Sequence, residues 1–484
     1  MFLKRDKDLA HIPIIKEVIR RLKKIMNSDL ISLAQKGAEA QEQGRLQEAL
    51  GFYQQALEID PTLPGLASNV AVVLTDLGEF TKAEAIFEEA IALEPENYAV
   101  WNNRGNLWKK QQKWSWAIED YSHAISLKED YFHAIYNRGS VYFALDRLVE
   151  SERDLQKAVG LNPLDSKPWV NLGEVAWELN RPDEALTYFE RAIQADGENA
   201  EGHWNRALWY LWRGDYLKGW SEYEWRWALP GIPEFYPEIA AWRGEREVHL
   251  LVYAEQGFGD TIQFSRFLKE TRTRVRAMTV DVQGSLLLWL RDFYPEIDFV
   301  ESSQIPKTVT HRVALQSLPL VLGIGKPPTI PLESKIASPE GIQRIAFCWS
   351  GSGVDLRRRI PLELWNPLFQ MKGKEWVSFQ TGNAVQELKR GYPLIFDLGS
   401  GLQNFKATAE GLAKIDLVVT IDTALAHLAG TIGKPTILLL PQVADWRWGA
   451  EGESCDWYPS VRCFRQRSRG DWAEVLARVG AELQ

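Results

Sequence analysis

Apolar and polar positions follow two different patterns along this chain of 484 residues. In the first half, apolar residues recur at helical spacing, and the whole pattern repeats every 34 residues. In the second half, short apolar runs alternate with helical stretches, as expected of β-α units. The pattern therefore predicts an all-helical repeat domain followed by an α/β region.

Three columns of side chains define the repeat. One column holds small residues: Ala49, Ala83, Ala117, Ser151, Ala185 and Gly219. A second holds large apolar residues: Tyr53, Phe87, Tyr121, Leu155, Phe189 and Tyr223. A third is again small: Gly37, Ala71, Gly105, Gly139, Gly173 and Ala207. Small residues let two helices approach and large ones fill the groove between them, so the repeats should stack. The pattern resembles the tetratricopeptide repeat, with five clear copies and an atypical sixth over residues 30–229.

A fourth column bears on function. Asparagines recur at the same spacing, on the first helix of each pair: Asn69, Asn103, Asn137, Asn171 and Asn205. In tetratricopeptide superhelices this helix lines the concave face, and Asn offers both hydrogen-bond donors and acceptors. We expect the column to contact the backbone of an extended protein or peptide. The alternative is that these side chains only brace neighbouring helices.

The second half predicts two α/β lobes. Residues 230–245 are expected to form a linker, residues 246–325 a first lobe, residues 326–341 an interlobe linker and residues 342–484 a second lobe. Buried strands are expected at 248–254, 275–280, 297–300, 312–315, 344–349, 376–380, 394–397, 417–421 and 436–440. Repeated β-α units imply parallel sheets, and two linked lobes imply a cleft between them.

The most informative turn follows the strand at 417–421. Asp422, Thr423 and Ala424 open a helix, and His427 lies about one turn further on. Open α/β sheets bind ligands at the carboxyl ends of their strands, and a helix N-terminus suits a phosphate. The alternative is that Asp422 only caps the helix and His427 is a packed core residue.

Two further polar turns are expected at the same cleft. The turn after the first strand contains Gln256, Gly257, Gly259 and Asp260, where Asp260 is a candidate general base or only a helix cap.

The other turn begins with Ser350 and Gly351 and ends with Arg357–Arg359. These arginines are candidates for binding a diphosphate, although a charge run is often only a solvated face. Gln380, at the end of the strand predicted over 376–380, is a further candidate on this edge.

Composition narrows the class of protein. A net charge of −9 argues against broad nucleic-acid binding. The three cysteines, without CxxC spacing, favour free thiols in a reducing, cytoplasmic compartment and disfavour a zinc site. No apolar run is long enough to span a membrane. Residues 1–29 predict a basic amphipathic helix, which either caps the repeats or makes peripheral contact with a membrane surface.

Residues 245–484 resemble the heptosyltransferase-like glycosyltransferases, which have the two-lobed GT-B fold. The residues that carry the resemblance are Gln256–Thr261, Ile421–His427 and Gly433–Pro435. Bacterial tetratricopeptide proteins with such a domain also share the segments 214–227, 445–448 and 457–459. The order of domains is similar to that of the O-GlcNAc transferases.

The resemblance implies metal-free, cofactor-free inverting transfer of a sugar from a UDP-, GDP- or ADP-linked donor to a protein or glycan. It assigns Asp260 as the base, the Asp422–His427 turn to the donor, and Arg359 to the departing diphosphate. The aromatic residues Trp446, Trp448, Trp457 and Tyr458 form either a wall of this site or part of the core. The competing hypothesis is a scaffold with a degenerate nucleotide-sugar-binding domain.

Overall fold

The computed structural model describes residues 29–63, 65–328, 343–351 and 356–484. The helix predicted for residues 1–29 lies outside this range except for its last residue, and the interlobe linker predicted over 326–341 lies largely outside it. The described chain divides into two compact units, residues up to 179 with 194–197, and residues 180–193 with 198–484. The domain boundaries derived from the sequence stay predictions.

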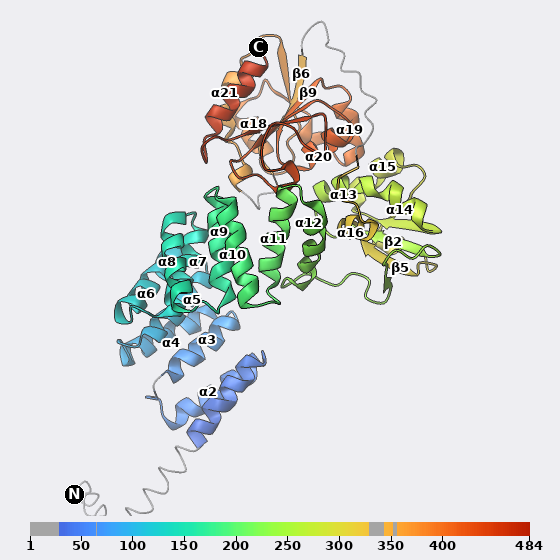
Figure 1. The fold of residues 1–484 in the computed structure, drawn as a ribbon. Coiled ribbons are helices and arrows are strands. Elements are labelled where there is room, and N and C mark those ends of the chain that lie inside the picture. The colour runs from blue at the N-terminus through green and yellow to red at the C-terminus, as the bar shows by residue number, and fades with distance from the viewer. Residues whose placement is uncertain (1–28, 64, 329–342, 352–355) are drawn as a thin grey trace, which may run out of the picture. The chain divides into compact units, whose positions relative to one another are not determined.

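The first unit is a stack of antiparallel helix pairs (Figure 1). A helix over residues 29–42 is followed by α2 (Leu46–Ile59), α3 (Leu66–Asp76), α4 (Phe80–Leu93), α5 (Tyr98–Lys110), α6 (Trp114–Leu127), α7 (Phe132–Ala144), α8 (Leu148–Leu161) and α9 (Ser166–Glu178). Each pair packs on the next, as α4 on α5, α6 on α7 and α8 on α9 show. The predicted solenoid of tetratricopeptide repeats is confirmed.

The small and large columns meet inside each helix pair. A side-chain carbon placed on Gly105 would lie 2.6 Å from the ring of Tyr121, and one on Gly37 would lie equally close to Tyr53. Glycine therefore admits the aromatic ring of the second helix. A buried ion pair also recurs with the repeat: Arg104 binds Asp120, and the structurally equivalent Arg138 binds Asp154.

The second unit begins with α10 (Pro182–Ala195), α11 (Ala200–Trp212), α12 (Tyr216–Tyr223) and the 3-10 helix η2 (Glu224–Ala228). A five-stranded sheet then contains β1 (Ala240–Ala241), β2 (His249–Tyr253), β3 (Ala277–Asp281), β4 (Asp298–Val300) and β5 (His311–Ala314). Its order is β1-β5-β2-β3-β4, and every pairing is parallel.

The second sheet has six strands: β6 (Gln343–Cys348), β7 (Lys374–Ser378), β8 (Phe396–Asp397), β9 (Leu417–Ile421), β10 (Thr436–Leu440) and β11 (Val461–Arg465). Its order is β11-β10-β9-β6-β7-β8, again all parallel. The helices that accompany the two sheets are α13 (Phe258–Phe264), α14 (Leu268–Arg274), α15 (Gly284–Phe293), α16 (Leu318–Leu322), α17 (Asn366–Phe369), α18 (Val385–Gly391), α19 (Phe405–Leu412), α20 (Ala424–Thr431) and α21 (Trp472–Glu482). Two parallel α/β lobes confirm the predicted GT-B-like fold class.

Two local expectations differ from the structure. Strand β11 was not predicted, because Arg462 and Arg465 interrupt its apolar pattern. Strand β1 lies inside the segment expected to be a linker, since two residues paired with β5 leave too short a pattern to recognise.

Candidate active site

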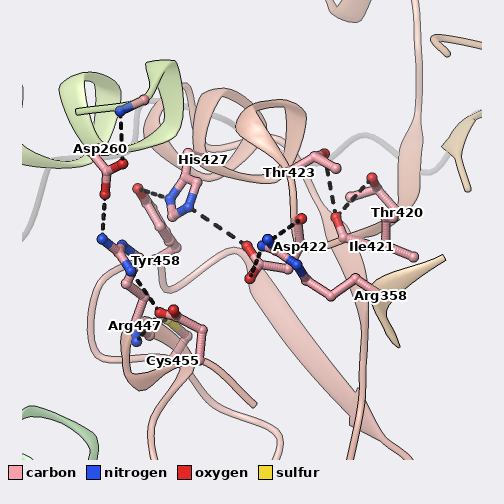
Figure 2. Close-up of polar contacts among 12 residues, drawn as sticks. Asp260, Arg358, Thr420, Ile421, Asp422, Thr423, His427, Arg447, Cys455 and Tyr458 are labelled. Atoms are coloured by element: carbon pink, nitrogen blue, oxygen red, sulfur yellow. Dashed lines mark hydrogen bonds and ion pairs between the residues drawn. The ribbon is translucent and has the colours of Figure 1, made fainter. Parts of the chain in front are cut away.

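Asp260 lies in the first turn of α13, just beyond the carboxyl end of β2. The backbone N–H of Gly257 donates to Asp260 Oδ2 over 3.2 Å. The other carboxylate oxygen accepts a hydrogen bond from the guanidinium of Arg447, which comes from the second lobe (Figure 2). Asp260 therefore caps its helix and also binds a charged partner far away in the sequence.

Arg447 joins two carboxylates. Its second guanidinium nitrogen lies 2.8 Å from Asp445 Oδ1, and only 13% of its side chain is exposed. The carboxylates of Asp260 and Asp445 hold the pKa of Arg447 well above its ordinary value, despite the burial that opposes them. Arg447 was not among the site residues predicted from the sequence, although it lies in the segment 445–448 that carries part of the resemblance.

Gly259 explains how α13 and α20 approach each other. A side-chain carbon on Gly259 would lie 2.8 Å from Cδ2 of His427, which is closer than real contacts allow. The absence of a side chain at this position therefore lets the backbone of α13 rest on the imidazole ring. The turn at 256–260 and the turn at 422–427 are therefore in direct contact.

His427 is enclosed by protein. Its Nδ1 lies 2.9 Å from the hydroxyl of Tyr458, and its ring stacks on Trp448 with centroids 4.9 Å apart. Burial, with the nearby positive charge of Arg447, lowers the pKa of His427 well below its ordinary value. The ring is therefore neutral and shapes the site, and its Nε2 lies 3.9 Å from Asp422 Oδ1.

Asp422 follows β9 directly and is 6% exposed. Its Oδ2 accepts a hydrogen bond from Arg358 Nη1 over 3.0 Å. Burial is the largest influence and raises the pKa of Asp422 to about 6; Asp445 adds to the rise, while Arg358 and Arg447 oppose it. Figure 2 shows two groups of polar contacts: one joins Asp260 to Arg447, and the other runs from His427 through Asp422 to Arg358.

The turn that follows β6 lies beside Asp422. A side-chain carbon on Gly351 would lie 3.9 Å from Thr423 Cγ2, so Gly351 and Thr423 face each other across the strand ends. Thr423 precedes Ala424, the first residue of α20. The turn that begins at Ser350 and the turn at 422–427 therefore lie next to each other.

Gln380 forms hydrogen bonds with the backbone of this turn. Its Nε2 donates to the carbonyl oxygens of Ser350 and Thr381, and its Oε1 accepts from the backbone N–H of Ser350 over 2.9 Å. The Gln380 side chain is 3% exposed, and its amide group is engaged in these intramolecular hydrogen bonds. Gln380 positions Ser350; direct donor binding by Gln380 stays a prediction.

The three consecutive arginines separate. Arg358 reaches Asp422, whereas Arg359 Nη2 lies 2.6 Å from Glu387 Oε1 in an exposed ion pair on α18. Arg357 is exposed. The position that the resemblance assigned to the diphosphate, Arg359, thus points toward α18, and Arg358 is the arginine at the Asp422 turn.

Gln256 lies behind the Asp260 turn. Its Nε2 donates to the hydroxyl of Tyr223 over 3.4 Å, and its backbone oxygen accepts from Gln283. Next to it, Glu255 pairs with the buried Arg226 at 3.0 Å. Burial raises the pKa of Glu255 to about 7, and the charge of Arg226 opposes this rise.

The predicted aromatic wall is part of the core. Trp446, Trp448, Trp457 and Tyr458 are each at most 3% exposed. They pack on one another, and Trp446 and Trp457 also pack on Trp220. Their rings therefore offer no open platform for a base or a sugar. The three cysteines are free and buried, as expected.

Two asparagines of the repeat column brace neighbouring repeats. Asn103 Nδ2 donates to Ser68 over 3.1 Å, and Asn137 Nδ2 donates to Asn102 over 3.1 Å. Asn69 is exposed, and Asn171 and Asn205 are partly buried. The bracing alternative thus accounts for part of the column, and contact with a peptide stays a prediction for the rest.

The cluster brings together groups with opposite tasks. Carboxylates such as Asp260 accept protons, and guanidinium groups stabilise developing negative charge. Both lie where ligands bind in open α/β sheets. Within the described residues, no group of three or more His, Cys, Asp or Glu side chains is arranged to hold a metal ion.

Comparison with known families agrees with the two-part organisation. Residues 383–465 match glycosyltransferase family 9 (heptosyltransferase), a segment that contains Asp422, His427 and Arg447. Tetratricopeptide repeats match residues 40–107, 132–163 and 166–199. In the described part of the chain, no helix has the length and hydropathy needed to cross a bilayer.

Similar proteins cover the chain to different extents. Protein FlbA of Caulobacter vibrioides is 23% identical over 88% of this chain and 85% of its own length. Human tetratricopeptide repeat protein 6 is 27% identical over a match that covers 32% of this chain and 29% of the human protein. The solved structure of Pseudomonas aeruginosa PilF has 20% identity and a TM-score of 0.38, covering 43% of this chain and 94% of its own.

Proposed function

The chain carries tetratricopeptide repeats followed by a glycosyltransferase family 9 domain, and from this premise we propose that it is a metal-independent, inverting glycosyltransferase. Its donor is a nucleotide-linked sugar, and its acceptor is a protein hydroxyl or a glycan recruited by the repeats. The observation that carries the proposal is the meeting of Asp260 and Arg447 beside the Asp422 turn, at the carboxyl ends of strands.

Asp260 is the proposed general base. In the transfer step the acceptor hydroxyl gives its proton to the Asp260 carboxylate, and its oxygen attacks the anomeric carbon. The bond from that carbon to the diphosphate breaks, and the diphosphate leaves with the electron pair. A single displacement of this kind inverts the anomeric configuration. A carboxylate has lone pairs beyond those used by Gly257 and Arg447, so it retains the capacity to accept.

The leaving diphosphate gains negative charge, which preorganised donors stabilise. The candidates are the backbone N–H groups at the start of α20 and the guanidinium of Arg358, which lies over Asp422. Arg358 is 35% exposed, so a phosphate can reach it from solvent. Arg447 is the proposed positioning residue for Asp260.

Release of nucleoside diphosphate tests this proposal. The full chain is incubated with labelled UDP-, GDP- and ADP-linked sugars, with and without cell extract as a source of acceptors. We expect one donor to be consumed, and we expect Asp260→Asn to lower the rate by about 10²–10⁴-fold, the usual contribution of a general base. An unchanged rate in Asp260→Asn shows that the base is another group.

A scaffold that only binds a nucleotide sugar is the second candidate. It is favoured by one observation: both acidic groups of the site, Asp260 and Asp422, are already engaged by arginines. Thermal unfolding with UDP, GDP, ADP and their sugar conjugates tests whether the protein binds a nucleotide at all, because a ligand that binds the folded state raises the unfolding temperature. A protein that is stabilised by a nucleotide or nucleotide sugar but releases no nucleoside diphosphate favours the scaffold.

A further inference from the structure

A pocket of about 400 Å³ lies in the second unit, apart from the cluster of Asp260, Arg447 and Asp422. Its wall is built from η2, from the segment that follows η2, and from β1, β2 and β5 with the turn after it. None of the predicted donor-site residues lines this pocket. Its volume is within the usual range for a small-molecule site.

The position of the pocket is typical of a ligand site. Ala241, Tyr253 and Ala314 are the last residues of β1, β2 and β5, and all three line the pocket. These strands are parallel neighbours, so their carboxyl ends meet at one edge of the sheet. Ligands of open parallel sheets bind outside this edge.

The pocket has aromatic walls. Trp227, Phe235, Trp242 and Tyr253 line it. Trp227 and Phe235 are only partly buried, so their rings remain accessible, while Tyr253 packs against Phe235 with centroids 5.4 Å apart. Aromatic faces of this kind offer a large apolar contact to a ring that presents C–H groups.

The polar groups in the pocket are mainly acceptors. Glu224 and Glu234 bring carboxylates, and Arg312 brings the only guanidinium of the lining, 2.6 Å from Glu234. Because Arg312 is paired with Glu234, and Glu224 is paired with Arg226 just behind the lining, the lining does not attract a phosphate or carboxylate ligand. Carboxylates accept hydrogen bonds from hydroxyl groups.

A buried network fixes two of these groups in place. Arg226, 3% exposed, donates to Glu224 over 2.6 Å and to the hydroxyl of Ser317 over 2.7 Å. Ser317 in turn donates to Glu224 over 2.8 Å, and the indole N–H of Trp227 donates to Glu224 over 3.2 Å. The acceptor groups are therefore held before any ligand arrives, which reduces the entropy lost on binding.

We propose that this pocket binds one neutral, hydroxyl-rich sugar ring. The aromatic walls take the C–H face of the ring, and Glu224 and Ser317 accept from its hydroxyls. The ring belongs either to an acceptor glycan or to a free sugar. Assignment to an acceptor rests on the proposed transferase function, and it is favoured because Arg226 also binds Glu255, five residues before Asp260.

Saturation-transfer NMR on the full chain, without nucleotide, tests the pocket. The probes are the methyl glycosides of glucose, galactose, mannose and N-acetylglucosamine. The blocking variant is Ala241→Trp, because Ala241 is exposed in β1 and lines the pocket. The matched control is Ala240→Trp, since neighbouring residues of a strand face opposite sides.

We expect saturation transfer to the ring protons of at least one glycoside, at least a tenfold loss in Ala241→Trp, and no loss in Ala240→Trp. No transfer to any glycoside, or equal transfer to both variants, overturns the proposal.

A second arm adds the labelled nucleotide sugars. A labelled disaccharide assigns the pocket to an acceptor glycan, whereas binding without a disaccharide assigns it to a free sugar. Transfer to protein acceptors with no glycoside binding rejects the pocket and keeps the proposed function. Glycoside binding with no use of any donor supports the pocket and rejects the proposed function.

Discussion

Asp422 is a carboxyl group whose protonation the fold changes. Burial raises its pKa to about 6, whereas the unfolded chain has a value of about 3.9. Between about pH 4 and pH 6 the Asp422 carboxyl is therefore more protonated in the folded than in the unfolded state, so its contribution to stability falls as pH rises through this window and changes little above it.

Asp422→Asn removes this dependence. We expect the variant to gain stability relative to the original chain as pH rises from about 4 to about 6.5, by about 2–3 kcal/mol. Thermal unfolding of both chains over this range, followed by tryptophan fluorescence, measures the gain. A difference that stays constant with pH would contradict the assignment of the raised pKa to Asp422.

Arg447 is expected to contribute strongly to stability in the candidate site, because it pairs with two carboxylates. Arg447→Gln leaves Asp260 and Asp445 without their cation in a largely buried place, and breaking a buried pair costs about 3–5 kcal/mol. Chemical unfolding of the full chain measures the loss. Arg359→Gln is the matched control, because its exposed pair with Glu387 contributes only about 0–1 kcal/mol.

Adding Asp260→Asn to Arg447→Gln should restore part of the lost stability. The double variant no longer holds an unpaired carboxylate at position 260, so its effect is smaller than the sum of the two single effects. Strict additivity would show that Arg447 acts without Asp260.

At the scale of elements, the contact of α13 with α20 depends on one missing side chain. Gly259→Ala places a carbon 2.8 Å from the His427 ring, and overpacking of this kind costs about 1–3 kcal/mol. We expect the rate of nucleoside diphosphate release to fall together with stability, because the Asp260 turn must move away from the Asp422 turn. Gly391→Ala is the control, since an added carbon there meets no heavy atom within 4 Å and the residue lies in α18, outside the candidate site. Equal effects of the two variants would show that the close approach is unimportant.

The elements themselves were predicted unevenly from the sequence. β9 and β10 were predicted with their observed bounds, because continuous apolar runs between turn residues leave little choice of ends. β11 was missed because Arg462 and Arg465 break its pattern; in the fold, Arg462 faces Glu453 and Glu482 at the surface. A strand at a sheet edge can carry such residues, and a single sequence does not mark the edge.

At the scale of the whole molecule, the repeats are proposed to recruit the acceptor. The double variant Asn69→Ala, Asn171→Ala should raise the KM for a protein acceptor several-fold. Hydrolysis of the nucleotide sugar, in which water replaces the acceptor, should be unchanged, because both residues lie in the repeats and outside the two α/β lobes. Steady-state kinetics with and without acceptor measure both quantities. An unchanged KM would favour the bracing role that Asn103 and Asn137 have in the structure.

The sequence by itself determined the order of the two architectures, the repeat period, and the three turns that converge. Periodicity and strand-end position are local properties, and parallel sheets bring strand ends to one edge whatever the details of packing. The sequence also gave Arg357–Arg359 as candidates for the diphosphate, with the resemblance assigning Arg359, and it suggested an aromatic wall at 446–458.

Only the tertiary structure decided which side chains meet. It selected Arg358 for Asp422, gave Arg359 to Glu387, brought Arg447 to Asp260 across 187 positions of sequence, and buried the tryptophans of the tail. It also formed the aromatic pocket from η2 and three strand ends. Such partnerships depend on long-range packing, and the same local pattern allows a charged or aromatic side chain to be either exposed or buried until the neighbouring elements are in place.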